Sequence, residues 1–138
     1  MSEGPDGHMG LMYHGSSPDT PGYGVKKLSY YTCKKLAETL KGSAWDAIET
    51  VREDEGIYVY KFTQGAKPIW VAWNDNPESR LVIIPGIRSA RVKVTLAVPD
   101  CESGKAVSDY SNAFKSEIKA VDNGKISIAL GEIPVYIE

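Results

Sequence analysis

The sequence predicts a mainly β protein, an antiparallel β-sandwich of seven or eight short strands preceded by one amphipathic α-helix. Two observations carry this prediction. Residues 24–42 repeat their apolar side chains with the 3.6-residue period of a helix. From Ala47 onward apolar and polar side chains alternate, which is the period of a half-buried strand, and short turn sequences separate the alternating runs.

Composition divides the chain into three regions. Residues 1–24 are rich in Gly, Pro, Ser and Asp, so we expect a flexible segment, and residues 1–9 resemble vector-derived sequence because they end in GHM. The helix is expected over residues 25–42 and the β-sandwich over residues 43–138. A chain of 138 residues suits one domain with a buried core.

The predicted helix has an unusually wide apolar side. More than half of its circumference is covered by one set of residues: Val25, Leu28, Tyr30, Cys33, Leu36, Ala37 and Leu40. Lysines and Glu38 fill most of the remainder, and Gly42 is expected to end the helix. A stripe of this width is typical of a helix that packs on more than one neighbour.

Eight candidate strands follow the helix. They are expected over residues 47–53, 57–63, 68–74, 80–86, 90–98, 116–121, 125–130 and 134–138. The run 80–86 is apolar on both faces, which indicates a strand buried on both sides. In the run 90–98, Val92 and Val94 are expected to point inward and Thr95 outward.

The charge balance argues against several partners. A net charge of −2 provides no basic surface for nucleic acid or an anionic membrane, and neither is expected as a partner. No apolar run approaches the roughly 20 residues that span a bilayer. The first residues lack the pattern of a signal peptide, and the localisation stays open.

The sequence predicts no catalytic residue, no metal site and no cofactor. The two histidines, His8 and His14, precede the helix, so the β region has none for a nucleophilic triad or a zinc site. Asp100, Glu102 and Asp109 share one polar loop and could offer oxygen ligands to calcium, although a solvated loop is the preferred interpretation.

Two cysteines leave the redox state open. Cys33 lies in the helix and Cys101 in a loop, and neither belongs to a C-x-x-C pair. Free thiols are the preferred interpretation, and a Cys33–Cys101 disulfide stays an alternative.

Aromatic side chains crowd two neighbouring strands. Trp70, Trp73, Tyr58 and Tyr60 are the candidate carbohydrate-binding residues, because aromatic rings on a sandwich can stack against sugar rings. The alternative is that they pack in the core or at a domain interface, since each ring buries a large area. Alternation places Trp70 and Trp73 on opposite faces, so only one of them can lie in the core. Trp45 is expected to pack where the helix meets the sandwich.

Three stretches together resemble a known arrangement: GYGVKKLSYYTCKKLAETLKGSAWDAI, GIYVYKFTQGAKPIWVAWND and GKISIALGEIPVYIE. They are similar to the C-terminal β-sandwich domain, with the last barrel helix, of retaining (β/α)8-barrel glycoside hydrolases of the β-xylosidase-like and cellulase-like superfamily. The resemblance covers roughly residues 10–138 and concerns structure rather than catalysis. It implies that the catalytic carboxylates lie on barrel strands absent from this chain, and it is compatible with an extracellular protein.

Three hypotheses about function follow. The first is a non-catalytic accessory domain that braces a catalytic barrel. The second is a carbohydrate-binding module that uses exposed aromatics to bind polysaccharide. The third is a stand-alone interaction domain that forms a homodimer through the helix, unless the helix folds back over one of the chain's own sheets.

Overall fold

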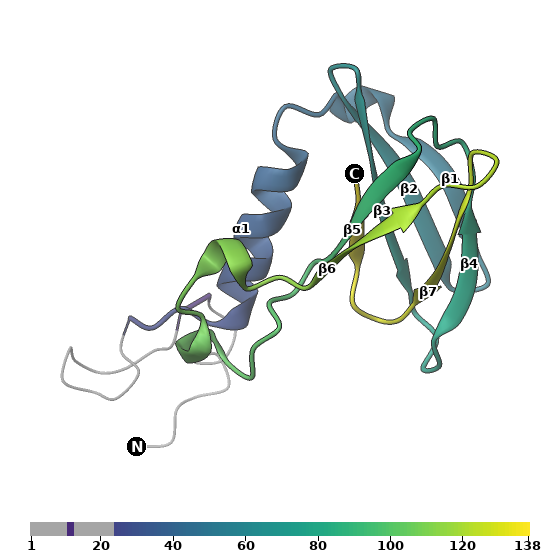
Figure 1. Cartoon of the computed structure of the whole chain (residues 1–138). Helices are drawn as coiled ribbons and strands as arrows, with labels where there is room; N and C mark the ends of the chain where they lie inside the picture. Colours follow the sequence, from purple (N-terminus) through teal and green to yellow (C-terminus); the bar gives the residue numbers. More distant parts are fainter. Residues whose placement is uncertain (1–10, 13–23) are drawn as a thin grey trace.

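The computed structural model describes residues 11–12 and 24–138, and it shows the predicted fold class. Eight strands form two antiparallel sheets, with one α-helix beside them (Figure 1). The prediction of a mainly β, sandwich-like protein is therefore confirmed. Most of the segment expected to be flexible, including residues 1–9 and both histidines, lies outside the described residues.

The strands lie close to their predicted positions. Their bounds are β1 Glu49–Asp54, β2 Ile57–Gln64, β3 Lys67–Asn74, β4 Arg80–Ile84, β5 Arg91–Leu96, β6 Ser116–Ala120, β7 Ile126–Leu130 and β8 Val135–Ile137. Short 3-10 turns precede β1 at Trp45–Ala47 and interrupt the connection from β5 to β6 at Gly104–Ala106 and Tyr110–Asn112. Alternation of side chains was sufficient to locate every strand within a few residues.

The larger sheet has six strands in the order β1-β2-β3-β8-β5-β6, and β4 pairs with β7 in a separate two-stranded sheet. The turn between β6 and β7 illustrates why the chain reverses where it does. Asn123 and Gly124 have φ angles of 49° and 73°, which Asn and Gly adopt more readily than other residues.

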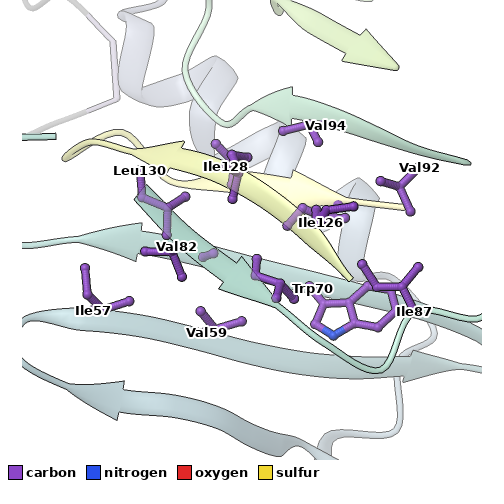
Figure 2. Packing of buried hydrophobic residues seen from close by; sticks show 14 residues of the cluster. Ile57, Val59, Trp70, Val82, Ile87, Val92, Val94, Ile126, Ile128 and Leu130 are labelled. Atoms are coloured by element: carbon purple, nitrogen blue, oxygen red, sulfur yellow. The ribbon is translucent and has the colours of Figure 1, made fainter. Parts of the chain in front are cut away.

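One apolar layer fills the space between the two sheets, and we call it the inner core (Figure 2). Its buried members are Ile57, Val59, Trp70, Ala72, Val82, Ile84, Ile87, Val92, Val94, Ile126, Ile128, Leu130, Val135 and Ile137. Val92 and Val94 point inward as predicted. Figure 2 shows Trp70 beside Ile87 at one end of this layer and Ile57 and Leu130 toward the other.

Two expectations about side-chain burial are wrong. The strand β4 is not buried on both sides, because Leu81 is 74% exposed and Ile83 is 62% exposed. A two-stranded sheet that packs on one partner buries only alternate residues, here Val82 and Ile84. Thr95 was expected to point to solvent, yet it is buried where it pairs with Tyr136 across β5 and β8.

A second apolar layer lies on the opposite face of the six-stranded sheet, and we call it the outer cluster. It comprises Leu40, Ile69, Val71, Ala97 and Tyr136, with Phe62 and Trp73 packed at its margin. Leu40 is the contribution of the helix α1, which spans Leu28–Leu40. The outer cluster is much smaller than the inner core, so the sheet is fully covered on one face only.

The helix is shorter than the predicted range 25–42. Lys27 has extended backbone angles, its amide donates to the Leu11 carbonyl at 2.9 Å, and Lys26 bridges Met12. This pairing holds the preceding residues in extended conformation, which delays the first helical turn to Leu28. At the other end Gly42 has a φ of +78°, the left-handed conformation expected just beyond a helix.

Candidate functional site

Three of the four candidate carbohydrate-binding residues form one row on the outer face of the sheet. The rings of Tyr58 and Trp73 stack with centroids 5.1 Å apart and planes inclined by 16°. Tyr60 approaches Trp73 on a diagonal at 5.7 Å. We call Tyr58, Tyr60 and Trp73 the aromatic row. All three are half-buried, so the row covers the sheet and still presents part of its surface to solvent.

Trp70 does not belong to this row. It follows the opposite alternation of β3, lies in the inner core and is 2% exposed. The two tryptophans therefore point to opposite faces of the sheet, as alternation predicts. Trp45, which was expected at the junction of helix and sandwich, is 63% exposed and forms a T-shaped contact with Phe62, with ring centroids 5.8 Å apart.

The acidic side chains near the first hairpin are held by neighbouring partners. Arg52 forms ion pairs with Asp54 and Glu55, and the Lys61 ammonium lies 3.5 Å from Glu49. The Tyr60 hydroxyl donates to Glu53 at 2.9 Å, and this hydrogen bond is the main reason why the pKa of Tyr60 is raised. These contacts are exposed and are typical of a solvated strand end.

The helix α1 exposes the middle of its apolar side. Leu36 is 44% exposed, and Cys33 and Ala37 are also exposed. Among the residues of this side only Leu40, in the last turn, is fully buried. The helix therefore touches the outer face of its own sheet at its last turn. The middle of the predicted apolar stripe, at Cys33, Leu36 and Ala37, is exposed, whereas Val25, Leu28 and Tyr30 at its start are half-buried.

The polar side of the same helix packs instead on the connection between β5 and β6. The Lys34 ammonium lies 4.1 Å from the ring centroid of Tyr110, and the Lys35 ammonium lies 5.2 Å from that of Phe114. The Tyr110 hydroxyl donates to Glu38 at 2.7 Å. Burial, with this hydrogen bond second, raises the pKa of Tyr110 well above its usual range. Cation–π contacts thus join the polar side of the helix, which its composition predicts to be exposed to solvent, to the connection between β5 and β6.

A backbone contact fixes the start of the helix against the same connection. Gly104 is buried, and a Cβ added there would lie 1.8 Å from the Lys26 carbonyl oxygen. Only glycine permits such an approach. Figure 1 shows the helix and this connection lying together, apart from the body of the sandwich. We call this unit, residues 24–44 and 97–115, the helical lobe.

The polar loop that could offer ligands to calcium uses its carboxylates internally. Asp109 accepts from the Ser111 amide at 3.1 Å and from the Asn112 side chain at 2.7 Å, while Asp100 lies 3.4 Å from the Lys115 ammonium. Within residues 11–12 and 24–138, no group of three or more His, Cys, Asp or Glu side chains is placed to hold a metal ion. Cys33 and Cys101 are both free.

Comparisons with protein-family models, with curated proteins and with solved structures gave no match to this chain. The resemblance to the sandwich domain of barrel glycoside hydrolases therefore stays a prediction. In the described part of the chain no helix has the length and apolar character needed to cross a bilayer.

Two features of the candidate site, a contact surface and a cavity, could not be located from the sequence. The polar side of the helix was expected to face solvent, whereas it binds Tyr110 and Phe114. Their spacing of four residues in a segment otherwise rich in polar residues was the available signal. The second feature is a basic cavity at one end of the sandwich, which is assembled from separate strands and turns.

Proposed function

We propose that this chain is a non-catalytic accessory β-sandwich domain that docks on a larger neighbouring domain through the exposed apolar side of α1. By the resemblance of its sequence, the neighbour is a (β/α)8-barrel of the glycoside hydrolase type. The domain would brace that barrel and contribute no reacting group.

The observation that carries this proposal is the exposure of the middle of the apolar side of α1. An isolated amphipathic helix on a sheet buries its apolar stripe and exposes its charges. Here Lys34 and Lys35 contact aromatic rings, while Cys33, Leu36 and Ala37 remain exposed. Burial of one leucine-sized side chain stabilises an interface by roughly 1.5–3 kcal/mol. Burial of the exposed apolar side of α1 against a partner would therefore be favourable.

Hydrogen exchange of α1 tests the docking directly. The protein encoded by the complete reading frame is compared with the 138-residue chain, and the amides of residues 33–37 are expected to exchange more slowly in the longer protein. Leu36→Glu should abolish that protection, since it places a charge in the interface. Ser29→Glu is the matched control, because Ser29 is an exposed polar position of the same helix.

Two outcomes would overturn the docking proposal. One is a reading frame that contains no further domain. The other is a dimer of the 138-residue chain in sedimentation experiments that Leu36→Glu dissociates, because the helix would then serve self-association. Equal exchange in both proteins would argue against docking as well.

The absence of catalysis is a separate part of the proposal. The carboxylates near the first hairpin are exposed and paired with Arg52, Lys61 or Tyr60, which leaves no carboxyl in a protected cleft there. The purified chain is expected to leave aryl glycosides intact. Turnover that a single carboxylate substitution abolishes would contradict the proposal.

The aromatic row supports a second candidate, a carbohydrate-binding module. Trp73 is half-buried and its ring contacts two tyrosines of the neighbouring strand on the outer face of the sheet, an arrangement that resembles a stacking platform. Affinity electrophoresis in polysaccharide gels tests this candidate. Retardation that Trp73→Ala removes and Trp45→Ala leaves unchanged would favour it, whereas unretarded migration in every gel would count against it.

A further inference from the structure

A cavity of about 970 Å³ opens at the end of the sandwich where Trp70 and Ile87 close the inner core. We call it the end pocket. Its walls come from the end of β2, the β2–β3 turn, the start of β3, the β4–β5 loop, the start of β5, the β6–β7 turn and Glu138. The volume lies in the range of sites that bind small organic molecules.

The end pocket is strongly basic in a chain whose net charge is −2. Its charged lining residues are Lys61, Lys67, Arg88, Arg91, Lys125 and Glu138. Glu138 lies 3.0 Å from the Lys67 ammonium, and Lys61 is paired with Glu49 outside the pocket. Within the described chain the side chains of Arg88, Arg91 and Lys125 form no ion pair.

Backbone hydrogen bonds hold the basic walls in place. The Ile87 amide donates to the Gly124 carbonyl at 2.9 Å, and the Val121 amide donates to the Ala90 carbonyl at 2.9 Å. These bonds join the loop that carries Arg88 to the turn that carries Lys125. A ligand would therefore meet preformed walls and lose little binding free energy to the ordering of loops.

The floor of the pocket is apolar. The Trp70 ring and Ile87 are both buried there, beside Pro68. The Trp70 indole Nε1 is a buried donor with no hydrogen-bond partner among the described residues. Most buried polar side chains are hydrogen-bonded, so a buried donor without a partner at the floor of a cavity is unusual. Among the described residues the hydroxyls of Ser43 and Thr95 share this state, but neither lines the pocket.

We propose that the end pocket binds a small organic anion with two or more carboxylate, sulfate or phosphate groups. Two exposed guanidinium groups can each form paired hydrogen bonds with such a group, and Lys125 adds a third positive charge. The apolar floor accommodates the carbon skeleton of the ligand. No residue of α1 lines the pocket, and the proposal does not depend on the docking proposal.

Two charged probes distinguish the source of the anionic group. Inorganic pyrophosphate represents phosphate, and a trimer of galacturonic acid represents carboxylated sugars, with the uncharged galactose trimer as its matched control. The chain has three tryptophans, so ¹H–¹⁵N spectra contain three indole signals, and Trp70→Phe identifies the signal at the pocket floor. We expect at least one charged probe to shift this signal and the uncharged trimer to leave it in place.

Substitution of the unpaired cations completes the test. The double variant Arg88→Gln with Arg91→Gln should weaken binding at least about tenfold, which is the expected loss for a charge-assisted contact. Arg80→Gln is the matched control, since Arg80 is exposed at the opposite end of β4 and does not line the pocket. Added salt should weaken binding, because the cations are exposed.

Three results would overturn the proposal. The first is the absence of any shift with either charged probe up to about 10 mM, a concentration far above the dissociation constants of specific ligands. The second is equal binding of the uncharged trimer. The third is unchanged affinity in the double variant. Arg88 and Arg91 are both exposed, so these substitutions are not expected to prevent folding, and a urea unfolding curve verifies that.

Discussion

The two ends of the inner core differ in whether a buried polar side chain is hydrogen-bonded. At the end near Ile57 and Leu130, Asn74 is completely buried and its side chain takes part in four hydrogen bonds. Its amide donates to the carbonyls of Glu78 and Leu130, and its oxygen accepts from Asn76. At the other end, the Trp70 indole has no partner in the described chain and adjoins the end pocket.

This difference separates a structural end from a candidate binding end. The Asn74 network satisfies backbone groups of the β3–β4 connection and of Leu130, the last residue of β7, so it ties the end of β3 to the end of β7. The end of the core near Trp70 has uncompensated cations and a cavity instead of such a network. Three predictions test this contrast, and a fourth, on the outer cluster, provides a reference.

Removal of the Asn74 network should cause the largest effect. Asn74→Ala leaves the carbonyls of Glu78 and Leu130 without their donor, and we expect a loss of about 2–4 kcal/mol in the free energy of unfolding. Urea unfolding measures it. Asn112→Ala is the control, because Asn112 is exposed and makes one side-chain bond, so its loss should be much smaller.

At the opposite end, Trp70→Phe should cost less, about 1–2 kcal/mol, because it removes ring volume and no hydrogen bond. The same unfolding measurement applies. A loss as large as that of Asn74→Ala would mean that the indole donor has a stabilising partner, and the contrast between the two ends would fail.

Alkaline pH tests Tyr136 of the outer cluster, which belongs to neither end of the inner core. Burial, and secondarily the neighbouring Cys33, raises the pKa of Tyr136 to about 12 from its ordinary value of 10.0. Between pH 10 and 12 the unfolded chain loses this proton first, so the folded state becomes less stable as pH rises. Tyr136→Phe should make that decline shallower in denaturation curves recorded across this interval. An identical slope would indicate that Tyr136 titrates normally.

The smallest effect is expected from the basic walls of the end pocket. Arg88→Gln should change the free energy of unfolding by no more than about 0.5 kcal/mol, because Arg88 is exposed and forms no ion pair with a described residue. Stability measured at low and high salt checks this value. A destabilisation above 1 kcal/mol would show that the cation supports the fold rather than a ligand.

The strands were predictable because local chemistry determines them. Alternation in β2 and β3 assigned Trp70 and Trp73 to opposite faces, and the Asn123–Gly124 pair marked a turn. The exposure of Leu81 was not predictable, since an apolar run does not reveal how many layers cover it. The end pocket was not predictable either, because Lys61, Arg88 and Lys125 come from distant segments that only the fold brings together.

The helical lobe was predictable in part. The apolar arc of α1 followed from its period, but the partner of each face did not. Gly104 contacts the backbone of Lys26, a residue far away in the sequence, and no local sequence pattern predicts that contact. The aromatic–lysine contacts around Tyr110 were missed for the same reason.

The position of β8 has a consequence for synthesis. This strand is the last in chain order, yet it lies in the middle of the six-stranded sheet, between β3 and β5. A nascent chain on the ribosome can close the β1–β2–β3 meander early, but the β5–β6 hairpin has no strand to join it to that meander until residues 135–137 emerge. Until then the edges of β3 and β5 that pair with β8 have no partner strand. A premature stop before Val135 would leave both edges free to pair with strands of neighbouring chains.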